Sequence, residues 1–372
     1  MIKNNDFMEK KIKILHVIPR YVIGGAEKLV WHYAKLLDKN KYEIYIASCV
    51  EDGEFRKQFE NLANVHIYMG SKSGAGGRIG AYLKLWKHTQ QIKPDIIHTH
   101  LLSADFFGFF VKLIWRKKIF WITTMHNVED ATSLWRKLGW CFILRKVDKA
   151  LAVSKSVEKF IKKYFAIKDE KCVLLLNGID TEKWLQVPTN KLFTHKKIQI
   201  ACIGRFWEQK GQIYLLQALS KVKNFDYELH FFGDGPLKES LISKSKEFKI
   251  FEKIVWHGAI SNVVDYIADI DIVVQPSLWE GLSLVVMEMM TAGRPIVTTP
   301  PAGDELLKDK ESGYIVPVKD AQKLVEAIDH IVANQQEAIE IAQEAREYAS
   351  KNFDIINNVL DLQSIYNNLV HN

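Results

Sequence analysis

The sequence predicts two tandem, doubly wound (Rossmann-like) α/β domains that face each other across a cleft. Three observations predict this fold class: strand and helix patterns alternate along the whole chain, the connections between them are short, and a polar stretch divides the alternation into two halves. The 372 residues suit two domains of about 180 residues, each able to bury a substantial apolar core. A disordered or fibrous protein is therefore excluded.

The first half alternates strand and helix from its start. A short apolar run at 13–18 indicates a buried strand, which leads through Gly24 and Gly25 into a helical pattern. Further strands are expected at 43–49, 65–68, 95–100, 119–126 and 150–154, and helices at 26–37, 53–62 and 79–92. Short connections predict strands that pair in parallel, with helices covering both faces of the sheet.

The second half repeats the same style. Strands are expected at 198–204, 227–233, 254–257, 272–275 and 295–298, and helices at 213–221, 236–247, 284–292 and from 320 onward. The stretch 181–194 is polar, contains Pro188 and shows no sustained period, so the joint is expected between Asp180 and Lys197. Ligands of such folds lie beyond the carboxyl ends of the strands, and the cleft between two facing domains is the expected active site.

The cysteines and the apolar runs indicate a cytoplasmic protein. Four cysteines lie far apart with no paired spacing, at Cys49, Cys141, Cys172 and Cys202. This spacing predicts neither a disulfide framework nor a thiolate zinc site. The N-terminus lacks the pattern of a signal peptide, and the apolar run at 106–115 is interrupted by Lys112 and is too short to cross a bilayer.

Charge divides the chain into a basic and an acidic half. Residues 1–200 carry 35 Lys and Arg against 19 Asp and Glu, whereas residues 201–372 carry 16 against 25. A basic half attracts nucleic acid, an anionic membrane or a phosphorylated substrate. No nucleic-acid-binding motif occurs in the chain, so a nucleic-acid partner is not expected.

Large aromatic residues lie among the cations of the basic half. Trp115, Trp135 and Trp140 are each flanked by Lys or Arg within a few residues, a pattern that fits the headgroup region of a membrane. The alternative is that these tryptophans pack inward as helix anchors beneath a solvated basic face.

The stretch 276–288 is the most informative for function. A strand ends there in a loop, and a helix is expected to begin near Ser283. Glu280 lies at the mouth of this helix and Glu288 one to two turns inside it. A helix N-terminus with Gly281 beside it suits a diphosphate, because it offers unpaired amide hydrogens and the positive end of a dipole. The deeper carboxylate suits the vicinal hydroxyls of a ribose, and Glu280 suits those of a sugar attached to the diphosphate.

A second stretch, 202–211, brings two cations to the end of a strand. Arg205 and Lys210 leave the carboxyl edge within a few residues of each other and are expected to converge on an anion. Alone, such a pair is usually a surface feature. Gly24 and Gly25, in the first strand-to-helix turn, would let the backbone approach a phosphate closely, although two glycines are often just a turn.

Three histidines fall at predicted strand ends. His98 and His100 share one side of an extended strand, but no convergent ligand set is evident, so a metal site is not expected. His126 is a candidate for a hydrogen bond to a sugar, with a structural polar residue as the alternative.

These motifs together resemble glycosyltransferase family 4, the retaining transferases of GT-B fold that use nucleotide-activated sugars. The resemblance spans nearly the whole chain and rests most on the two-glutamate frame 280–288 and on Arg205 and Lys210. Weaker motifs occur in the expected order at 24–27, 98–100, 124–126, 153–154, 177–180, 204–206, 209–211 and 233–236.

The resemblance implies a division of labour between the domains. It implies an acceptor-binding domain at 1–185, a donor-binding domain at 195–354, and a last helix at 355–372 that crosses back to the first domain. The implied catalytic residues are Glu280, His126, Arg205 and Lys210. The implied donor-binding residues are Gly24, Gly25, Arg205, Lys210, Glu280, Gly281, Leu282, Ser283, Leu284 and Glu288. No metal and no other cofactor is implied, since the cations and the helix dipole take the place of a divalent ion.

Within this scheme, Arg205 and Lys210 would hold the diphosphate, Glu280 would contact the donor sugar and Glu288 the ribose. His126 would lie near the transferred sugar and the acceptor.

The family typically retains the anomeric configuration without an obvious protein nucleophile. We therefore expect the β-phosphate of the donor to take the acceptor proton, and the only other carboxylates near His126 in sequence are Glu129 and Asp130. Where family members commonly have proline, this chain has Ser283, which we expect to cap the helix without loss of activity.

The expected function is transfer of a sugar to a glycan or lipid-linked acceptor, in the synthesis of a cell-surface polysaccharide or glycolipid. The basic half would dock the enzyme on the inner face of an anionic membrane. Two alternatives stay open: a nucleotide-sugar epimerase of the same fold, which needs no separate acceptor, and a catalytically silent partner protein that binds nucleotide-sugar without turnover.

Overall fold

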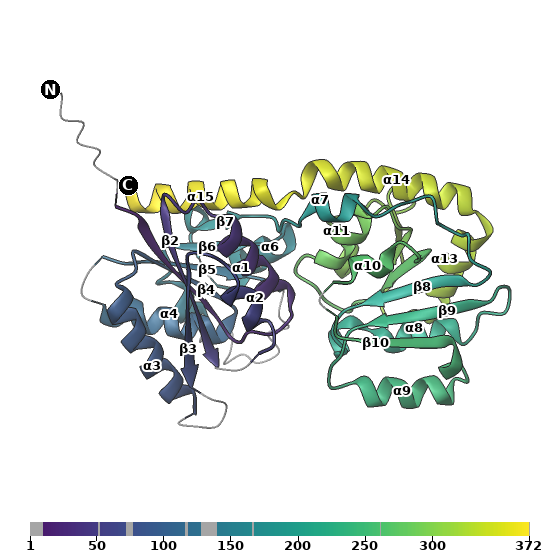
Figure 1. The fold of residues 1–372 in the computed structure, drawn as a ribbon, viewed down its shortest axis with the longest axis horizontal. Coiled ribbons are helices and arrows are strands. Elements are labelled where there is room, and N and C mark those ends of the chain that lie inside the picture. Colours follow the sequence, from purple (N-terminus) through teal and green to yellow (C-terminus); the bar gives the residue numbers. More distant parts are fainter. Residues whose placement is uncertain are drawn as a thin grey trace. The chain divides into compact units, whose positions relative to one another are not determined.

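The protein folds as two compact units, as its computed structural model shows (Figure 1). The structure describes residues 10–50, 53–71, 77–115, 118–127, 140–165, 167–260 and 262–371. The first unit comprises Met1–Leu176 and Ile356–Asn372, and the second comprises Asn177–Ile355. Each unit is built on one parallel sheet, of seven strands in the first and six in the second. The predicted class of two doubly wound α/β sheets is therefore confirmed.

The sheet of the first unit has the order β3-β2-β1-β4-β5-β6-β7. Its strands are β1 Ile12–Ile18, β2 Tyr42–Val50, β3 Val65–Ser71, β4 Ile96–His100, β5 Phe120–Met125, β6 Lys149–Ala152 and β7 Cys172–Leu174. Its helices are α1 Gly25–Leu36, α2 Arg56–Glu60, α3 Gly77–Ile92, α4 Leu102–Ile114, α6 Lys155–Tyr164 and the C-terminal α15 Ile355–His371. The central strand β4 is buried at all five positions, as expected for a parallel strand covered on both faces.

The sheet of the second unit has the order β10-β9-β8-β11-β12-β13. Its strands are β8 Ile198–Ile203, β9 Tyr227–Phe232, β10 Ile254–Gly258, β11 Ile272–Gln275, β12 Ile296–Thr298 and β13 Tyr314–Ile315. Its helices are α7 Thr181–Leu185, α8 Gln212–Leu219, α9 Lys238–Glu247, α10 Val264–Ile267, α11 Leu284–Thr291, α12 Pro300–Gly303, α13 Ala321–Ala333 and α14 Gln335–Asn352. Strand order reverses between β8 and β11, which makes their carboxyl ends the switch point of the sheet.

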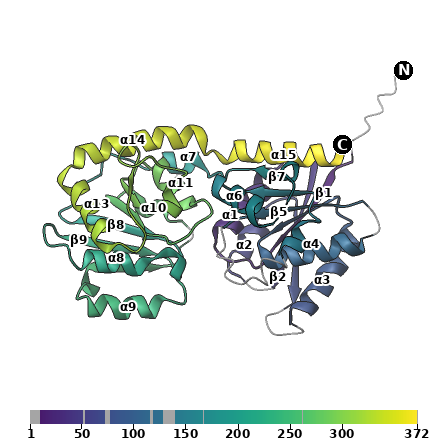
Figure 2. The same ribbon diagram turned by 180° about the vertical axis from the view of Figure 1, so that it is seen from behind.

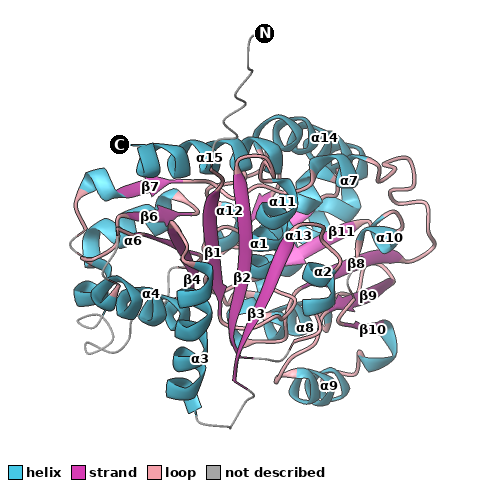
Figure 3. Cartoon of the chain, turned by 60° about the vertical axis from the view of Figure 1, so that its left-hand side comes forward, coloured by secondary structure: helices cyan, strands magenta, loops and turns pink. Residues whose placement is uncertain are grey.

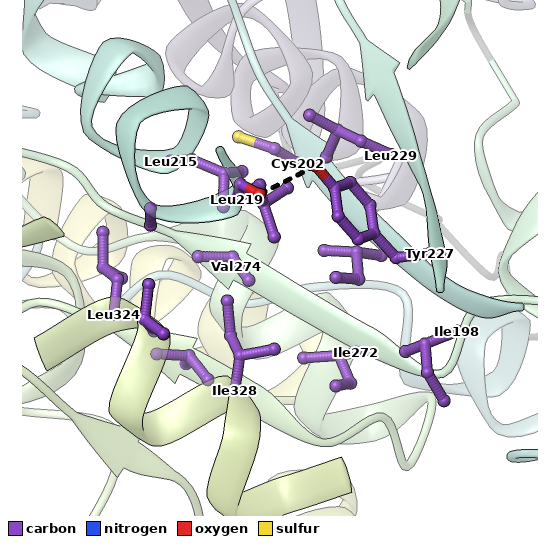
Figure 4. Packing of buried hydrophobic residues seen from close by; sticks show 14 of the residues in the cluster. Ile198, Cys202, Leu215, Leu219, Tyr227, Leu229, Ile272, Val274, Leu324 and Ile328 are labelled. Atoms are coloured by element: carbon purple, nitrogen blue, oxygen red, sulfur yellow. Dashed lines mark hydrogen bonds between the residues drawn. The ribbon is translucent and has the colours of Figure 1, made fainter. Parts of the chain in front are cut away.

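A close-packed apolar core holds this second sheet between its helices. Figure 4 shows Leu215 and Leu219 of α8 and Leu324 and Ile328 of α13 among the strand residues, including Val274 of β11. Close packing of this core fixes the position of each strand along the sheet. It therefore also fixes where the loops after the carboxyl ends of the strands begin.

The C-terminal helix α15 packs on the first unit (Figure 2). Tyr366 is fully buried and hydrogen-bonds His98 of β4 at 2.6 Å. Tyr42 of β2 donates from its hydroxyl to Oδ1 of Asn367 at 2.8 Å. The last helix therefore contributes side chains to the interior of the unit that the start of the chain builds.

A buried guanidinium ties together the loops beneath α11. Arg294 is fully buried, and burial lowers its pKa to about 10. It donates to the carbonyls of Ala292, Ile270 and Pro188 at 3.2, 3.1 and 2.6 Å. In the Gly-Arg-Pro sequence that follows α11, the arginine therefore joins segments of the fold and does not face a ligand.

The expected strands and most expected helices are present to within a few residues. Strands β7 and β13 were not predicted, because three- and two-residue strands carry no readable period. The stretch 181–194, expected to be irregular, contains α7, which the carboxylate of Asp180 caps by accepting from the amide of Lys183 at 3.1 Å.

Candidate functional site

The two stretches that the sequence singled out in the second half lie against each other at the switch point of the second sheet. The amide of Leu278 donates to the carbonyl of Gln209 at 2.7 Å, and the side-chain amide of Gln209 donates to the carbonyl of Trp279 at 2.9 Å. Gly211 has φ +63°, and a Cβ at this position would lie 2.1 Å from the carbonyl oxygen of Pro276. Backbone and side-chain contacts together therefore hold the loop after β8 against the loop after β11.

Glu280 is the most connected side chain of this site. It lies in the loop after β11, forms an ion pair with Lys210, and accepts a hydrogen bond from Ser277 Oγ at 3.0 Å. The side chains of Lys210 and Glu280 are only 16% and 7% exposed, so the pair is largely desolvated. A charged group in such surroundings is held firmly, because losing its partner would leave an unpaired buried charge.

Arg205 differs from Lys210 in its surroundings. The sequence predicted that these two cations converge on one anion, whereas the structure pairs Lys210 with Glu280. Arg205 is exposed, and within the described residues its guanidinium makes no hydrogen bond or ion pair. Lys210 is thus ion-paired with a carboxylate, whereas Arg205 is available to a ligand at the edge of the sheet.

Helix α11 begins as the sequence predicted. Ser283 is its N-cap, and the serine hydroxyl accepts from the amide of Val286 at 3.4 Å. Gly281 and Leu282 are buried in the approach to the helix and Leu284 is half-buried at its first position. Glu288 lies one turn inside the helix and is 9% exposed. The two carboxylates are therefore at different depths along one helix end, as predicted.

The glycine turn of the first unit precedes α1 at the end of β1. Gly24 is the N-cap, and a Cβ there would lie 2.4 Å from Oε2 of the buried Glu27. Gly25, the first helical residue, is exposed. The two glycines place no side chain of their own over this helix N-terminus, which lies beside the β1 and β4 switch point of the first sheet and has the carboxylate of Glu27 close to Gly24.

His126 follows β5 at the carboxyl edge of the first sheet. It lines a small pocket with Leu101, Thr124, Asn127 and Trp140. Burial lowers the pKa of His126 to about 4, so the imidazole is neutral at pH 7. The carboxylates Glu129 and Asp130 lie outside the described residues.

A cluster of histidines lies behind His126, and the sequence revealed only part of it. His98 and His100 stack on one side of β4 with ring centroids 4.3 Å apart, as the alternation of the strand predicted. His16 joins them from β1, where it is the register partner of His98. In the sequence, His16 is a single histidine inside an apolar strand, and nothing there indicated that it lies beside His98.

The three rings of His16, His98 and His100 present ligand atoms within 4.8 Å of one another, the only such group found within the described residues. All of their ring nitrogens, however, already have a polar partner within 3.5 Å. The arrangement fits a hydrogen-bonded cluster better than a metal centre, which would have to displace these partners.

Two family descriptions match the chain, one on each unit. Residues 23–183 match Glycosyltransferase Family 4, and residues 197–334 match Glycosyl transferases group 1. The chain belongs to the family 4, group 1 glycosyltransferases. It is therefore an enzyme, and the silent binding protein is set aside.

Relatives and solved structures agree with this membership. The chain is 26% identical to the O-antigen biosynthesis glycosyltransferase WclY of Escherichia coli, over 96% of this chain and 99% of the relative. It is 21% identical, over 97% and 98%, to an Escherichia coli UDP-Gal:alpha-D-GlcNAc-diphosphoundecaprenol alpha-1,3-galactosyltransferase. Among structures, Anabaena HepE in complex with UDP and glucose matches with a TM-score of 0.85 at 18% identity, over 96% of this chain and 100% of HepE. A glycosyltransferase from Rickettsia africae matches with 0.81 at 22%, over 98% and 100%.

The close approach at Gly211 gives a test of how this transferase holds its two loops together. We expect Gly211→Ala to destabilise the second unit by about 3 kcal/mol more than Gly258→Ala. Both glycines have positive φ, but a Cβ at Gly258 meets nothing within 4 Å, so the control shows only the cost of the left-handed backbone, about 1 kcal/mol. Thermal unfolding monitored by circular dichroism measures both. Equal shifts would mean that the loops are not held by this contact.

Proposed function

We propose that this transferase moves a hexose from a nucleotide-diphosphate sugar, a UDP-sugar, to a glycan or lipid-linked acceptor, with retention of anomeric configuration, in the synthesis of a cell-surface polysaccharide or glycolipid. The observation that carries the proposal is the frame of Lys210, Glu280 and Glu288 around the N-terminus of α11, with Arg205 exposed in the loop after β8. The names of the Escherichia coli relatives and the UDP complexes of HepE support the donor and acceptor classes.

The second unit would hold the donor. The diphosphate would lie at the N-terminus of α11, where the amides of Leu284 and its neighbours and the helix dipole favour negative charge. Arg205 would close on it from the exposed side. Lys210, at about 4 Å and an effective dielectric of about 20, would add on the order of 4 kcal/mol of gross attraction. Glu288 would accept hydrogen bonds from the ribose hydroxyls, and Glu280 from those of the sugar.

The ion pair of Lys210 and Glu280 gives each partner a second task. Glu280 fixes the ammonium in place before the donor arrives, so little reorganisation is needed when charge develops on the leaving diphosphate. Lys210 in turn holds the carboxylate of Glu280 in place, and the oxygens of a carboxylate accept hydrogen bonds from sugar hydroxyls. Preorganised charge of this kind takes the place that a divalent ion would fill, and no metal or other cofactor is proposed.

The first unit would supply the acceptor side. The glycine turn at Gly24 and Gly25, at the N-terminus of α1, would face the phosphates, and His126, neutral at pH 7, would hydrogen-bond the transferred sugar or the acceptor hydroxyl.

Removing the exposed cation is the cleanest test of the diphosphate site. We expect Arg205→Ala to lower kcat by roughly ten- to a thousandfold, because one charge that stabilises the leaving group is lost. Lys210→Ala should lower kcat at least as much, but this variant also leaves the buried carboxylate of Glu280 without its ion-pair partner. Release of UDP and formation of glycosylated acceptor from UDP-hexoses measure the effect.

The control is Lys223→Ala, which removes an exposed cation from the same unit. Normal turnover in both Arg205→Ala and Lys210→Ala would remove the proposed diphosphate site. Epimerised donor in the absence of any acceptor would identify the alternative, a nucleotide-sugar epimerase.

The stereochemistry of transfer follows from the proposed proton path. The acceptor oxygen would bond to the anomeric carbon on the face from which the diphosphate departs, and its proton would pass to an oxygen of the β-phosphate. We expect the anomeric proton of the product, observed by NMR, to keep the configuration of the donor. Mass spectrometry should detect no glycosylated enzyme, and a covalent sugar on Glu280, Glu129 or Asp130 would contradict the proposed path.

The membrane part of the proposal rests on other side chains than the tryptophans that the sequence suggested. Trp140 is buried and packs edge-on against Phe165, and Trp115 packs edge-on against Trp86, so these tryptophans are anchors of the fold. Trp135 lies outside the described residues. The docking role expected of the tryptophans themselves is therefore not supported.

Helices α3 and α4, which lie side by side in Figure 3, carry several of the exposed apolar residues of the first unit. These large side chains are between 41% and 75% exposed: Ile79 and Leu83 on α3, Phe106, Leu113 and Ile114 on α4, and Phe142 after them. Lys84 and Lys87 are exposed on α3, and α3 contains no acidic residue. A face that is both apolar and cationic suits an anionic bilayer surface. No helix within the described residues is both long and apolar enough to cross a bilayer, and we propose peripheral attachment on the cytoplasmic side.

Charge neutralisation on α3 tests this attachment. The double variant Lys84→Gln with Lys87→Gln should bind anionic liposomes roughly thirtyfold more weakly than the native enzyme, since each basic residue near such a surface contributes about 1 kcal/mol. The matched control, Lys221→Gln with Lys223→Gln in the second unit, should bind as the native enzyme does. Flotation at rising salt measures both, and native binding that ignores ionic strength and lipid charge would contradict the proposal.

A further inference from the structure

A continuous chain of hydrogen bonds links His126, at the edge of the first sheet, to the C-terminal helix. His126 Nε2 lies 3.1 Å from His100 Nδ1, and His100 Nε2 lies 3.2 Å from His16 Nδ1. His16 Nε2 lies 3.5 Å from the hydroxyl of Tyr366 on α15. The same hydroxyl lies 2.6 Å from His98 Nδ1, and His98 Nε2 lies 2.7 Å from Thr124 Oγ1.

Every imidazole in this chain is neutral. His16, His98 and His100 are fully buried, and burial lowers the pKa of His16 to about 3 and those of His98 and His100 well below the usual range. A neutral imidazole has one N–H donor and one lone pair. Each link therefore needs a donor on one side and an acceptor on the other, and the tautomer of one ring determines that of the next.

The hydroxyl of Tyr366 sets the direction of the chain. Its contact with His98 Nδ1, at 2.6 Å, is shorter than the range of about 2.7–3.2 Å typical of an N–H···O hydrogen bond and fits an O–H donor, whereas its contact with His16 Nε2 is 3.5 Å. The hydroxyl therefore donates to His98 Nδ1, and His98 Nε2–H donates to Thr124. The oxygen of Tyr366 can then only accept from His16 on its other side.

The remaining links follow from this choice. His16 donates from Nε2, so its Nδ1 must accept from His100 Nε2–H. His100 Nδ1 must then accept from His126 Nε2–H. His126 is left with an unprotonated Nδ1, a lone pair outside the chain in a residue that lines the pocket at the sheet edge.

We propose that Tyr366, His16 and His100 are positioning residues that hold His126 in the Nε2–H tautomer, so that its Nδ1 accepts a hydrogen bond from a hydroxyl of the sugar or the acceptor. The last clause rests on the proposed function, whereas the tautomer itself does not. In this arrangement the C-terminal helix acts on the reaction site through side chains that never touch substrate.

The tautomer can be read directly in the full-length protein. Two-bond ¹H–¹⁵N correlation spectra of histidine-labelled enzyme distinguish the two neutral tautomers of each ring, and His126→Gln assigns the His126 signals. We expect His126 to be a single Nε2–H tautomer in the native enzyme. A native His126 in the Nδ1–H form overturns the proposal without any further variant.

Tyr366→Phe removes the oxygen on which the direction depends. We expect the His126 signals of this variant to become a mixture of both tautomers, and kcat/KM for the acceptor to fall by the same fraction as the Nε2–H population. The matched control is Tyr42→Phe, which removes another buried hydroxyl from the α15 contact but lies outside the chain. It should leave the tautomer of His126 unchanged.

Three further results would overturn the proposal: an unchanged His126 tautomer in Tyr366→Phe, the same change in Tyr42→Phe, or histidine signals that shift on adding a chelator, which would mean that a bound metal determines the tautomers. Full transferase activity in His126→Gln, with the tautomers behaving as expected, would instead refute the proposed substrate role of His126 and leave the positioning chain standing.

Discussion

All-parallel strand pairing is the constraint on which the rest of this structure depends. It brings the carboxyl ends of every strand in a unit to one edge of the sheet. Residues far apart in the chain therefore become neighbours because of the strand pairing, whether or not they attract each other. In the second unit, the reversal of strand order between β8 and β11 places the loops that follow them side by side. Lys210 and Glu280, 70 residues apart, meet for this reason.

Local sequence explains which positions of the candidate site could be predicted. Glu280, Ser283 and Glu288 were placed correctly because all three lie within one loop and the first turns of one helix, where local rules of capping and helix geometry apply. Ser283, in particular, caps α11 as expected of a small hydroxyl residue at that position. Local sequence was sufficient for each of these.

What the sequence did not reveal depends on side-chain partners across strands. Arg205 and Lys210 look equivalent in sequence, but only the position of the neighbouring loop decides that Lys210 meets a carboxylate while Arg205 remains exposed. His16 looks like an isolated polar residue in an apolar strand, and only the register of β1 with β4 places it beside His98. Trp140 resembles an interfacial anchor beside its basic neighbours, but its ring packs against Phe165, a contact that no local pattern encodes.

The buried Arg294 has a consequence for how the second unit can open locally. Its guanidinium donates hydrogen bonds to the end of α11, to the turn before β11 and to the irregular segment at Pro188. If any of these three segments detached, the buried guanidinium of Arg294 would lose hydrogen-bond acceptors. We therefore expect the amides of the three segments to exchange their hydrogens together, as one cooperative unit. Local opening of the second unit is thereby expected to leave the end of α11 and its two neighbouring segments together.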